Sequence, residues 1–171
     1  MDKIRDSADI LQPEKEETYQ FIEKLLSSVK ENFSTNRVHI GMDEAVMLGL
    51  GNYLKENGYK KGSLIIEEHC NRVVDICRKL ELKPMIWSDM YITANSTGGY
   101  YDLPENTDCS KWEKPKKDLG LVYWDYYHAD TRTYEKMLDI HAQLSDNVIF
   151  AGGSWIWNGI SPNYSKTYAC T

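Results

Sequence analysis

The sequence lacks several features that define large classes of proteins. It has no apolar run near the ~18 residues that a membrane-spanning helix needs, and its 171 residues carry a formal net charge of −6 rather than a basic excess. A general nucleic-acid binder needs a basic surface. The first residues, 1–6, also lack the apolar stretch of a signal peptide. We therefore expect one cytoplasmic domain that binds neither membranes nor nucleic acids.

Cysteines that could form a metal site are lacking as well. None of the four cysteines has metal-ligand spacing, and the histidines other than His39 are spread over separate predicted helices and loops. Cys70 and Cys77 fall on one face of a predicted helix, Cys109 lies in a predicted loop, and Cys170 is next to last. We expect buried thiols in a reducing compartment, and we expect no metal and no cofactor.

What the sequence does contain is an alternation of helical and strand patterns. Helical spacing of apolar residues predicts helices over residues 13–33, 48–56, 64–80 and 131–144, the first of them starting at Pro13. Short apolar runs predict strands over residues 38–42, 84–88, 119–126 and 147–151. Residues 91–118 show no periodicity, and a loop of that length is uncommon unless it is functional. The alternation implies a parallel sheet, so the fold class is α/β, and four strands make half of a (β/α)8 TIM barrel.

The most informative segment is Val38-His39-Ile40-Gly41-Met42-Asp43-Glu44. Side chains alternate along a strand, so His39, Gly41 and Asp43 should share a polar face. The two carboxylates then fall at the carboxyl end of the strand, where barrel enzymes carry their active sites. Adjacent acids can hold different pKa values, one ionised and one protonated to act as a general acid. The alternative is a pair that caps the next helix.

This His-x-Gly-x-Asp-Glu pattern resembles the signature of the family-20 glycoside hydrolases, the β-N-acetylhexosaminidases. That signature reads roughly His-x-Gly-Gly-Asp-Glu, and Met42 replaces its second glycine. Residues 84–90, 122–127 and 150–157 look like the family's following strands, and the likeness to compact bacterial members covers nearly the whole chain. The resemblance implies that residues 1–171 are a single segment of a catalytic barrel. It would hold the fourth to seventh strands and lack the N-terminal strands and the last one.

The same resemblance implies a mechanism and a substrate. Family members are retaining and work by substrate assistance, in which the 2-acetamido oxygen attacks the anomeric carbon. Carried over, Glu44 is the general acid, and Asp43 orients and polarises the acetamido N–H. The expected substrates are glycans with terminal non-reducing β-linked N-acetylglucosamine or N-acetylgalactosamine.

Tryptophans near the carboxyl ends of the predicted strands suggest a sugar pocket. A single tryptophan is more often part of a core, but several at one end favour a site, because aromatic faces suit apolar sugar surfaces. The family walls its acetamido pocket with tryptophans and holds the acetamido carbonyl with a tyrosine. Tyr126 is our substitute for that tyrosine, because the matching strand has Ile156 and Trp157. The tryptophans are Trp87, Trp124, Trp155 and Trp157.

Three polar residues complete the predicted site. His39 either supports the carboxylates through a hydrogen bond or is a core histidine, and Asp89 and Asp125 are candidates to hold sugar hydroxyls. Asp130 is more simply the cap of the following helix.

Three other functions compete with this interpretation. One is another retaining glycosidase, with Glu44 as acid and Asp89 as nucleophile. The others are a carbohydrate-binding module and an inactive remnant of the enzyme. Dependence on the 2-acetamido group separates a hexosaminidase from the other retaining glycosidase. Binding without turnover indicates the carbohydrate-binding module or the inactive remnant. The sequence leaves open the oligomeric state, the linkage and the choice between the two hexosamines.

Overall fold

The computed structural model describes residues 2–153 and 164–170 and contains a parallel sheet of four strands in the order β1-β2-β3-β4. His39 pairs with Met85, Trp87 with Val122, and Trp124 with Ala151. The carboxyl ends of the strands therefore meet at one edge, as they do in a (β/α)8 barrel. The α/β prediction of a partial barrel is confirmed. The strands are β1 Arg37–His39, β2 Lys83–Trp87, β3 Gly120–Trp124 and β4 Val148–Ala151.

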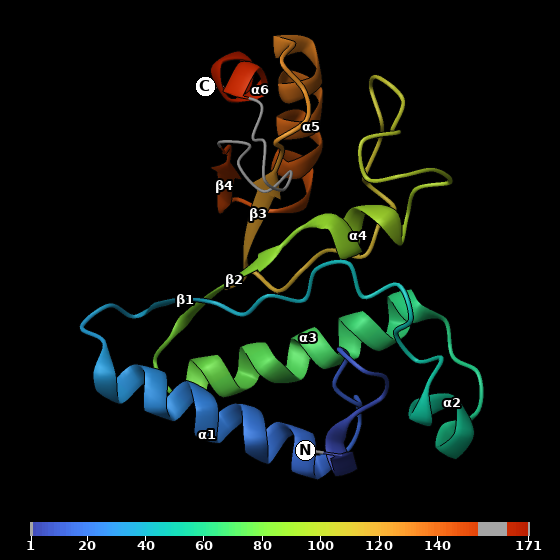
Figure 1. Ribbon diagram of the computed structural model, residues 1–171, viewed down its shortest axis with the longest axis vertical. Helices are drawn as coiled ribbons and strands as arrows, with labels where there is room; N and C mark the ends of the chain where they lie inside the picture. The colour runs from blue at the N-terminus through green and yellow to red at the C-terminus, as the bar shows by residue number, and fades with distance from the viewer. Residues whose placement is uncertain (1, 154–163, 171) are drawn as a thin grey trace.

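Helices cover the sheet in chain order (Figure 1). Helix α1 packs on α3, α3 packs on β2, and α5 packs on β3 and β4. Along β2, Pro84 and Ile86 are buried while Met85 and Trp87 are half-buried, which is the alternation of a strand with one face against helices. The helices are α1 Glu16–Asn32, α2 Asn52–Asn57, α3 Gly62–Lys79, α4 Asp89–Thr93, α5 Thr131–Leu144 and α6 Tyr164–Cys170, after a 3₁₀ turn at Asp2–Ile4.

Three cysteines lie free in the core, as predicted. Cys70, Cys77 and Cys109 are fully buried and form no disulfide. Burial raises the pKa of Cys70 and of Cys77 to about 11, so both thiols stay protonated at neutral pH. The side chain of Cys170 lies outside the described residues. In the described part of the chain, we find no helix with the length and apolar character that a bilayer crossing requires.

The predicted ends of several elements are wrong for a common reason, which is backbone in the left-handed region. The first strand ends at His39 rather than Met42, because Gly41 and Met42 have φ of 73° and 70°. Helix α1 starts at Glu16, and Glu14, with φ of 69°, keeps Pro13 out of it. The short second helix starts at Asn52 rather than residue 48, after Gly49 with φ of 75°.

Residues 94–119 form most of the connection between β2 and β3. After the five-residue helix α4, the segment continues without another helix. It nevertheless contributes to the core, since Tyr100, Leu103 and Cys109 are buried in the same cluster as Ile86 and Met137. The loop thus takes the place of a covering helix, which periodicity alone did not predict.

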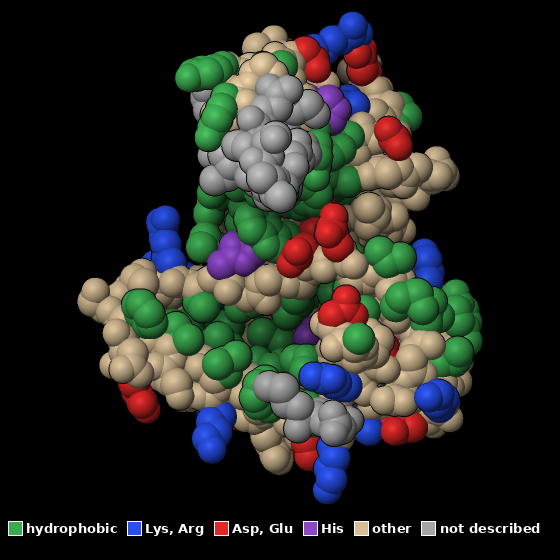
Figure 2. All heavy atoms as spheres, viewed as in Figure 1, with side chains coloured by type: hydrophobic (Ala, Val, Ile, Leu, Met, Phe, Trp, Pro, Cys, Tyr) green, Lys and Arg blue, Asp and Glu red, His purple; other side chains and the backbone are tan. Residues whose placement is uncertain are grey.

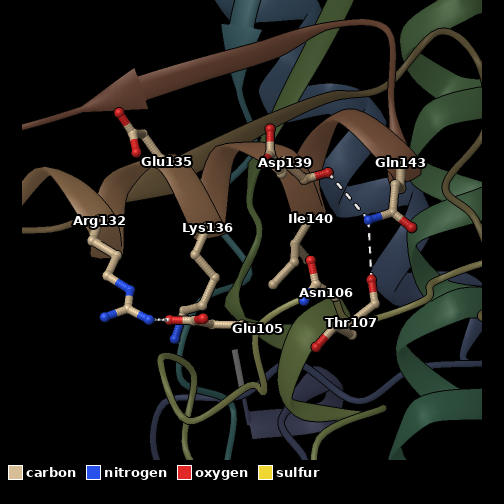
Figure 3. A pocket seen from close by; sticks show the side chains of 9 residues that line it. All are labelled: Glu105, Asn106, Thr107, Arg132, Glu135, Lys136, Asp139, Ile140 and Gln143. Carbon is tan, nitrogen blue, oxygen red and sulfur yellow. Dashed lines mark hydrogen bonds and ion pairs between the residues drawn. The ribbon is translucent and has the colours of Figure 1, made fainter.

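Polar side chains of α5 that point toward this loop hold it in place (Figure 3). The Lys136 ammonium donates to the backbone oxygens of Tyr101 and Leu103, each at 3.0 Å. Gln143 donates to the Thr107 oxygen at 3.1 Å and accepts from the Cys109 N–H at 3.1 Å. An ion pair also joins Arg132 to Glu105, and the two segments enclose a polar cavity of about 330 Å³.

Candidate active site

The Asp43-Glu44 pair lies in a tight turn that follows β1. The turn stays attached to β2, because the Trp87 N–H donates to the Gly41 oxygen at 3.3 Å. Glu44 has φ of 46°, a left-handed conformation that costs a non-glycine residue ~1–2 kcal/mol. Both carboxylates are exposed. On the face of the molecule drawn in Figure 2, acidic side chains gather near the middle, where the chain leaves β1. Strain of this kind clusters at functional sites.

The backbone conformation of Met42 explains why the signature that this segment resembles has a glycine at this position. Its φ of 70° is one that glycine adopts without steric cost. The methionine side chain offsets the strain through packing, since it contacts all three hydrophobic clusters of the described residues. Compared with a glycine, the methionine adds backbone strain and gains apolar contacts.

His39 and Trp87 come from neighbouring strands and lie together. Their ring centroids are 4.4 Å apart, and His39 Nδ1 accepts the Gly41 N–H at 3.1 Å. Burial lowers the pKa of His39, and the negative charge of Asp43 partly opposes that shift. A neutral His39 therefore supports the backbone that leads to the carboxylates.

Asp89 is a buried carboxylate beneath the Asp43-Glu44 turn, and the residue is only 4% exposed. Oδ2 accepts the Glu44 N–H at 2.8 Å, and Oδ1 accepts the Trp124 Nε1–H at 3.4 Å. Burial raises the pKa of Asp89, while these two donors oppose the shift. Both oxygens thus face protein donors.

Trp124 lies in an aromatic cluster. The rings of Tyr100 and Tyr126 stack on the indole with centroid distances of 5.1 and 5.8 Å, and the Tyr101 hydroxyl donates to the Trp124 oxygen at 2.8 Å. A Cβ on Gly153 would come 2.8 Å from Tyr126 Cδ1, so that position must stay small. Sequence reasoning missed Tyr100 and Tyr101, and only the unusual length of their loop indicated a role.

The two aspartates that follow β3 hold local structure. Asp125 is fully buried, and it accepts hydrogen bonds from the Tyr123 hydroxyl at 2.9 Å and the Tyr127 N–H at 2.9 Å. It also pairs with His128 at 2.9 Å. These bonds hold the Asp125 carboxylate within the protein, and its contact with a sugar hydroxyl stays a prediction. Asp130 accepts the Thr133 N–H at 2.9 Å and caps α5, as predicted.

The carboxylates of the turn lie in one region with Asp89, Trp124 and Tyr126, at the carboxyl edge of the sheet. The negative charge of Asp43 acts on Asp89 and Tyr126, adding to the effect of burial, which raises the pKa of each. A cavity of about 380 Å³ is lined by Glu44, Asp89 and Trp124, among others. No group of three His, Cys, Asp or Glu side chains suited to a metal occurs in residues 2–153 and 164–170. The predicted site residues Trp155 and Trp157 lie outside the described residues.

The catalytic-domain model of glycosyl hydrolase family 20 matches residues 2–136. The chain belongs to glycosyl hydrolase family 20. The matched region of this family-20 chain includes the Asp43-Glu44 turn and strands β1 to β3, and it ends before β4.

A solved structure gives the same fold. The chain is similar to the family-20 β-N-acetylhexosaminidase from Streptomyces coelicolor A3(2), with 13% identity and a TM-score of 0.52. The match covers 88% of this chain and 25% of that enzyme, so the family-20 chain spans about a quarter of the length of its structural relative. No curated protein matches the sequence.

Proposed function

We propose that this family-20 chain carries the catalytic pair of a β-N-acetylhexosaminidase that removes terminal non-reducing N-acetylhexosamine from β-linked glycosides. The observation that carries the proposal is the Asp43-Glu44 turn at the carboxyl end of a parallel strand, within the residues that match the family. The structural relative from Streptomyces coelicolor is itself a β-N-acetylhexosaminidase, which supports the same activity here.

The proposed mechanism is retaining and substrate-assisted. The acetamido oxygen of the sugar attacks the anomeric carbon, and Glu44 gives its proton to the departing glycosidic oxygen. Asp43 accepts a hydrogen bond from the acetamido N–H and stabilises the positive charge of the oxazolinium intermediate. Adjacent positions suit these roles, because the leaving oxygen and the acetamido nitrogen lie on different sides of the same ring.

The geometry disfavours a mechanism with Asp89 as nucleophile. A nucleophilic carboxylate must reach the anomeric carbon, whereas Asp89 is 4% exposed and both its oxygens accept hydrogen bonds from Glu44 and Trp124. A carbohydrate-binding module is also disfavoured, because binding alone needs no exposed carboxylate pair.

Substrate discrimination tests the reaction. We expect the full-length protein to hydrolyse an aryl β-N-acetylglucosaminide and to leave the matching β-glucoside, which lacks the 2-acetamido group, essentially intact. Proton NMR of the first product should show retained anomeric configuration. Equal turnover of both substrates would contradict substrate assistance, and binding without turnover would indicate a carbohydrate-binding or inactive protein.

The general acid has a separate signature. Glu44→Gln should lower the rate on natural glycosides by about 10²–10⁴-fold, the usual contribution of a positioned general acid. Dinitrophenyl glycosides should lose much less, because their leaving group departs without a proton. An equal loss on both substrates would rule out Glu44 as the acid.

A further inference from the structure

We propose that Asp89 is a positioning residue, which fixes the general acid Glu44 through its backbone rather than by touching the sugar. The proposal rests on the hexosaminidase activity proposed above. It replaces the predicted role of Asp89 as a ligand of a sugar hydroxyl.

The contact itself is short and buried. Asp89 Oδ2 lies 2.8 Å from the Glu44 nitrogen, and Asp89 is 4% exposed while Glu44 is exposed. A carboxylate that accepts a backbone N–H makes a charge-assisted bond, which is about twice as strong as a neutral one. The exposed acid is thus attached at its main chain to a fixed, solvent-shielded group.

Glu44 needs such an attachment because its own backbone is strained. Its φ of 46° follows the left-handed Gly41 and Met42, so the turn has little intrinsic preference for this path. Strained residues persist only where the surroundings hold them. Without the bond to Asp89, the turn would relax toward ordinary backbone angles, and the Glu44 carboxyl group would move with it.

Asp89 is itself held in place by a residue of the neighbouring strand β3. Its other oxygen, Oδ1, accepts the Trp124 Nε1–H at 3.4 Å, and Trp124 ends β3. Just before it, the Ser88 N–H donates to the Val122 oxygen at 3.1 Å. One carboxylate therefore joins the ends of three strands and sets Glu44 relative to the aromatic cluster around Trp124.

Both oxygens of Asp89 must be acceptors for this arrangement. An asparagine has one acceptor oxygen, and its NH₂ group would face either the Glu44 N–H or the indole N–H. Asp89→Asn keeps the size of the side chain and disrupts one of the two bonds. It is therefore a sharper variant than alanine.

Asp6, from the N-terminal segment, offers a matched control because it binds the same connection that contains Glu44. It is 3% exposed and accepts the backbone N–H groups of Gly49 and Tyr53 at 2.8 and 2.7 Å. It has no hydrogen bond to Asp43 or Glu44 among the described residues. Asp6→Asn thus removes the same kind of bond a few residues away from the acid.

The experiment compares leaving groups in the full-length protein. We would measure kcat/KM for N,N′-diacetylchitobiose, which needs protonation, and for the dinitrophenyl β-N-acetylglucosaminide, which does not. Asp89→Asn should lower the first by about 10²-fold, the cost of misplacing a catalytic group by ~1 Å, and the second by less than about tenfold. Asp6→Asn should lower both by the same factor.

Equal losses of Asp89→Asn on both substrates would overturn the positioning role and leave Asp89 a structural residue. If Asp89→Asn fails to fold, Asp89→Glu decides, because it keeps two acceptors and displaces them by one methylene. A leaving-group-dependent loss in that variant supports the proposal, and an equal loss overturns it. The proposed function fails separately, and first, if the unmodified protein hydrolyses neither substrate.

Discussion

Asp43 and Glu44 are neighbours in sequence but differ in backbone conformation. Among the described residues, Glu44 has a left-handed φ and Asp43 does not. Successive side chains therefore leave the turn in directions that an extended strand would not give. The proposed mechanism requires such a divergence, because it assigns the two adjacent carboxylates to two different atoms of one sugar.

Asp43→Asn should leave the fold intact and weaken binding of an N-acetyl thiazoline mimic of the intermediate. An amide cannot match the charge-assisted bond to the acetamido nitrogen, which is worth ~1.5–3 kcal/mol, so the Kd should rise roughly 10- to 100-fold. Calorimetric titration measures it. An unchanged Kd would show that Asp43 does not polarise the acetamido group.

Met42 permits a direct measurement of backbone strain. Met42→Ala and Met42→Gly both remove the apolar side chain, but only glycine relieves the left-handed backbone. The glycine variant should therefore be about 1 kcal/mol more stable than the alanine variant in urea unfolding.

Ile40 is the control for this comparison, because it is half-buried against two of the same clusters and has no positive φ. At position 40 the alanine variant should be more stable than the glycine variant by ~0.5–1 kcal/mol. The same order of stability at both positions would contradict the strain at Met42.

At the scale of elements, β1 shows how far the sequence predicts the site. Alternation puts Val38 and Ile40 on the face opposite His39, and both pack against the cluster formed by α1 and α3. It did not predict where the strand ends, because nothing about methionine signals a left-handed φ at Met42. Likewise, Tyr100 reaches the core from a loop without periodicity, so its contact with Trp124 depends on tertiary packing alone.

A buried polar chain connects β2, the loop and α5 behind Trp124. His141 Nε2 lies 2.7 Å from Ser88 Oγ, which lies 2.6 Å from the Tyr100 hydroxyl, while His141 Nδ1 lies 2.6 Å from the Met137 oxygen. The carbonyl can only accept, so Nδ1 carries the proton and Nε2 accepts from Ser88. Burial lowers the pKa of His141 to about 4. The histidine is therefore neutral in the folded protein.

This depressed pKa predicts a loss of stability in mild acid. An unfolded histidine has a pKa of ~6.5, so between about pH 6.5 and 4 the unfolded state binds one more proton at this residue. Stability should fall as the pH falls through that window. His141→Gln, which keeps an acceptor for Ser88, should reduce the slope by about 1.4 kcal/mol per pH unit.

Urea unfolding across the window measures the slope. His69, whose pKa burial also lowers to about 4, titrates equally in both proteins and does not affect the difference. Identical slopes for the two proteins would show that His141 is not buried in its neutral form.

At the scale of the whole molecule, the described strands form an open sheet. Within residues 2–153 and 164–170, no strand pairs with the outer edge of β1 or of β4. Beside β1 lies an apolar groove of about 510 Å³, and Figure 2 shows hydrophobic side chains in the hollow between β1 and α1. Unpaired edges and apolar grooves both promote association. The half-barrel predicted from four strands implies two such edges, whereas no sequence pattern indicated the groove.

We expect residues 1–171, produced alone, to self-associate. Leu25 is 52% exposed in the groove, so Leu25→Lys should reduce association, whereas Leu54→Lys, at 38% exposure on α2 and outside the groove, should not. Sedimentation velocity at several concentrations distinguishes the three proteins. A monodisperse monomer with a sharp unfolding transition would contradict the prediction.

The attachment of the 94–119 loop to α5 has a consequence for sequence variation. Solvent-facing helix positions usually change freely in evolution, because little depends on them. Here Lys136 and Gln143 hold the loop that places Tyr100 against Trp124. Changes at these two positions would alter the packing around Trp124 in the proposed sugar pocket, so orthologues should either keep both residues or change the loop at the same time.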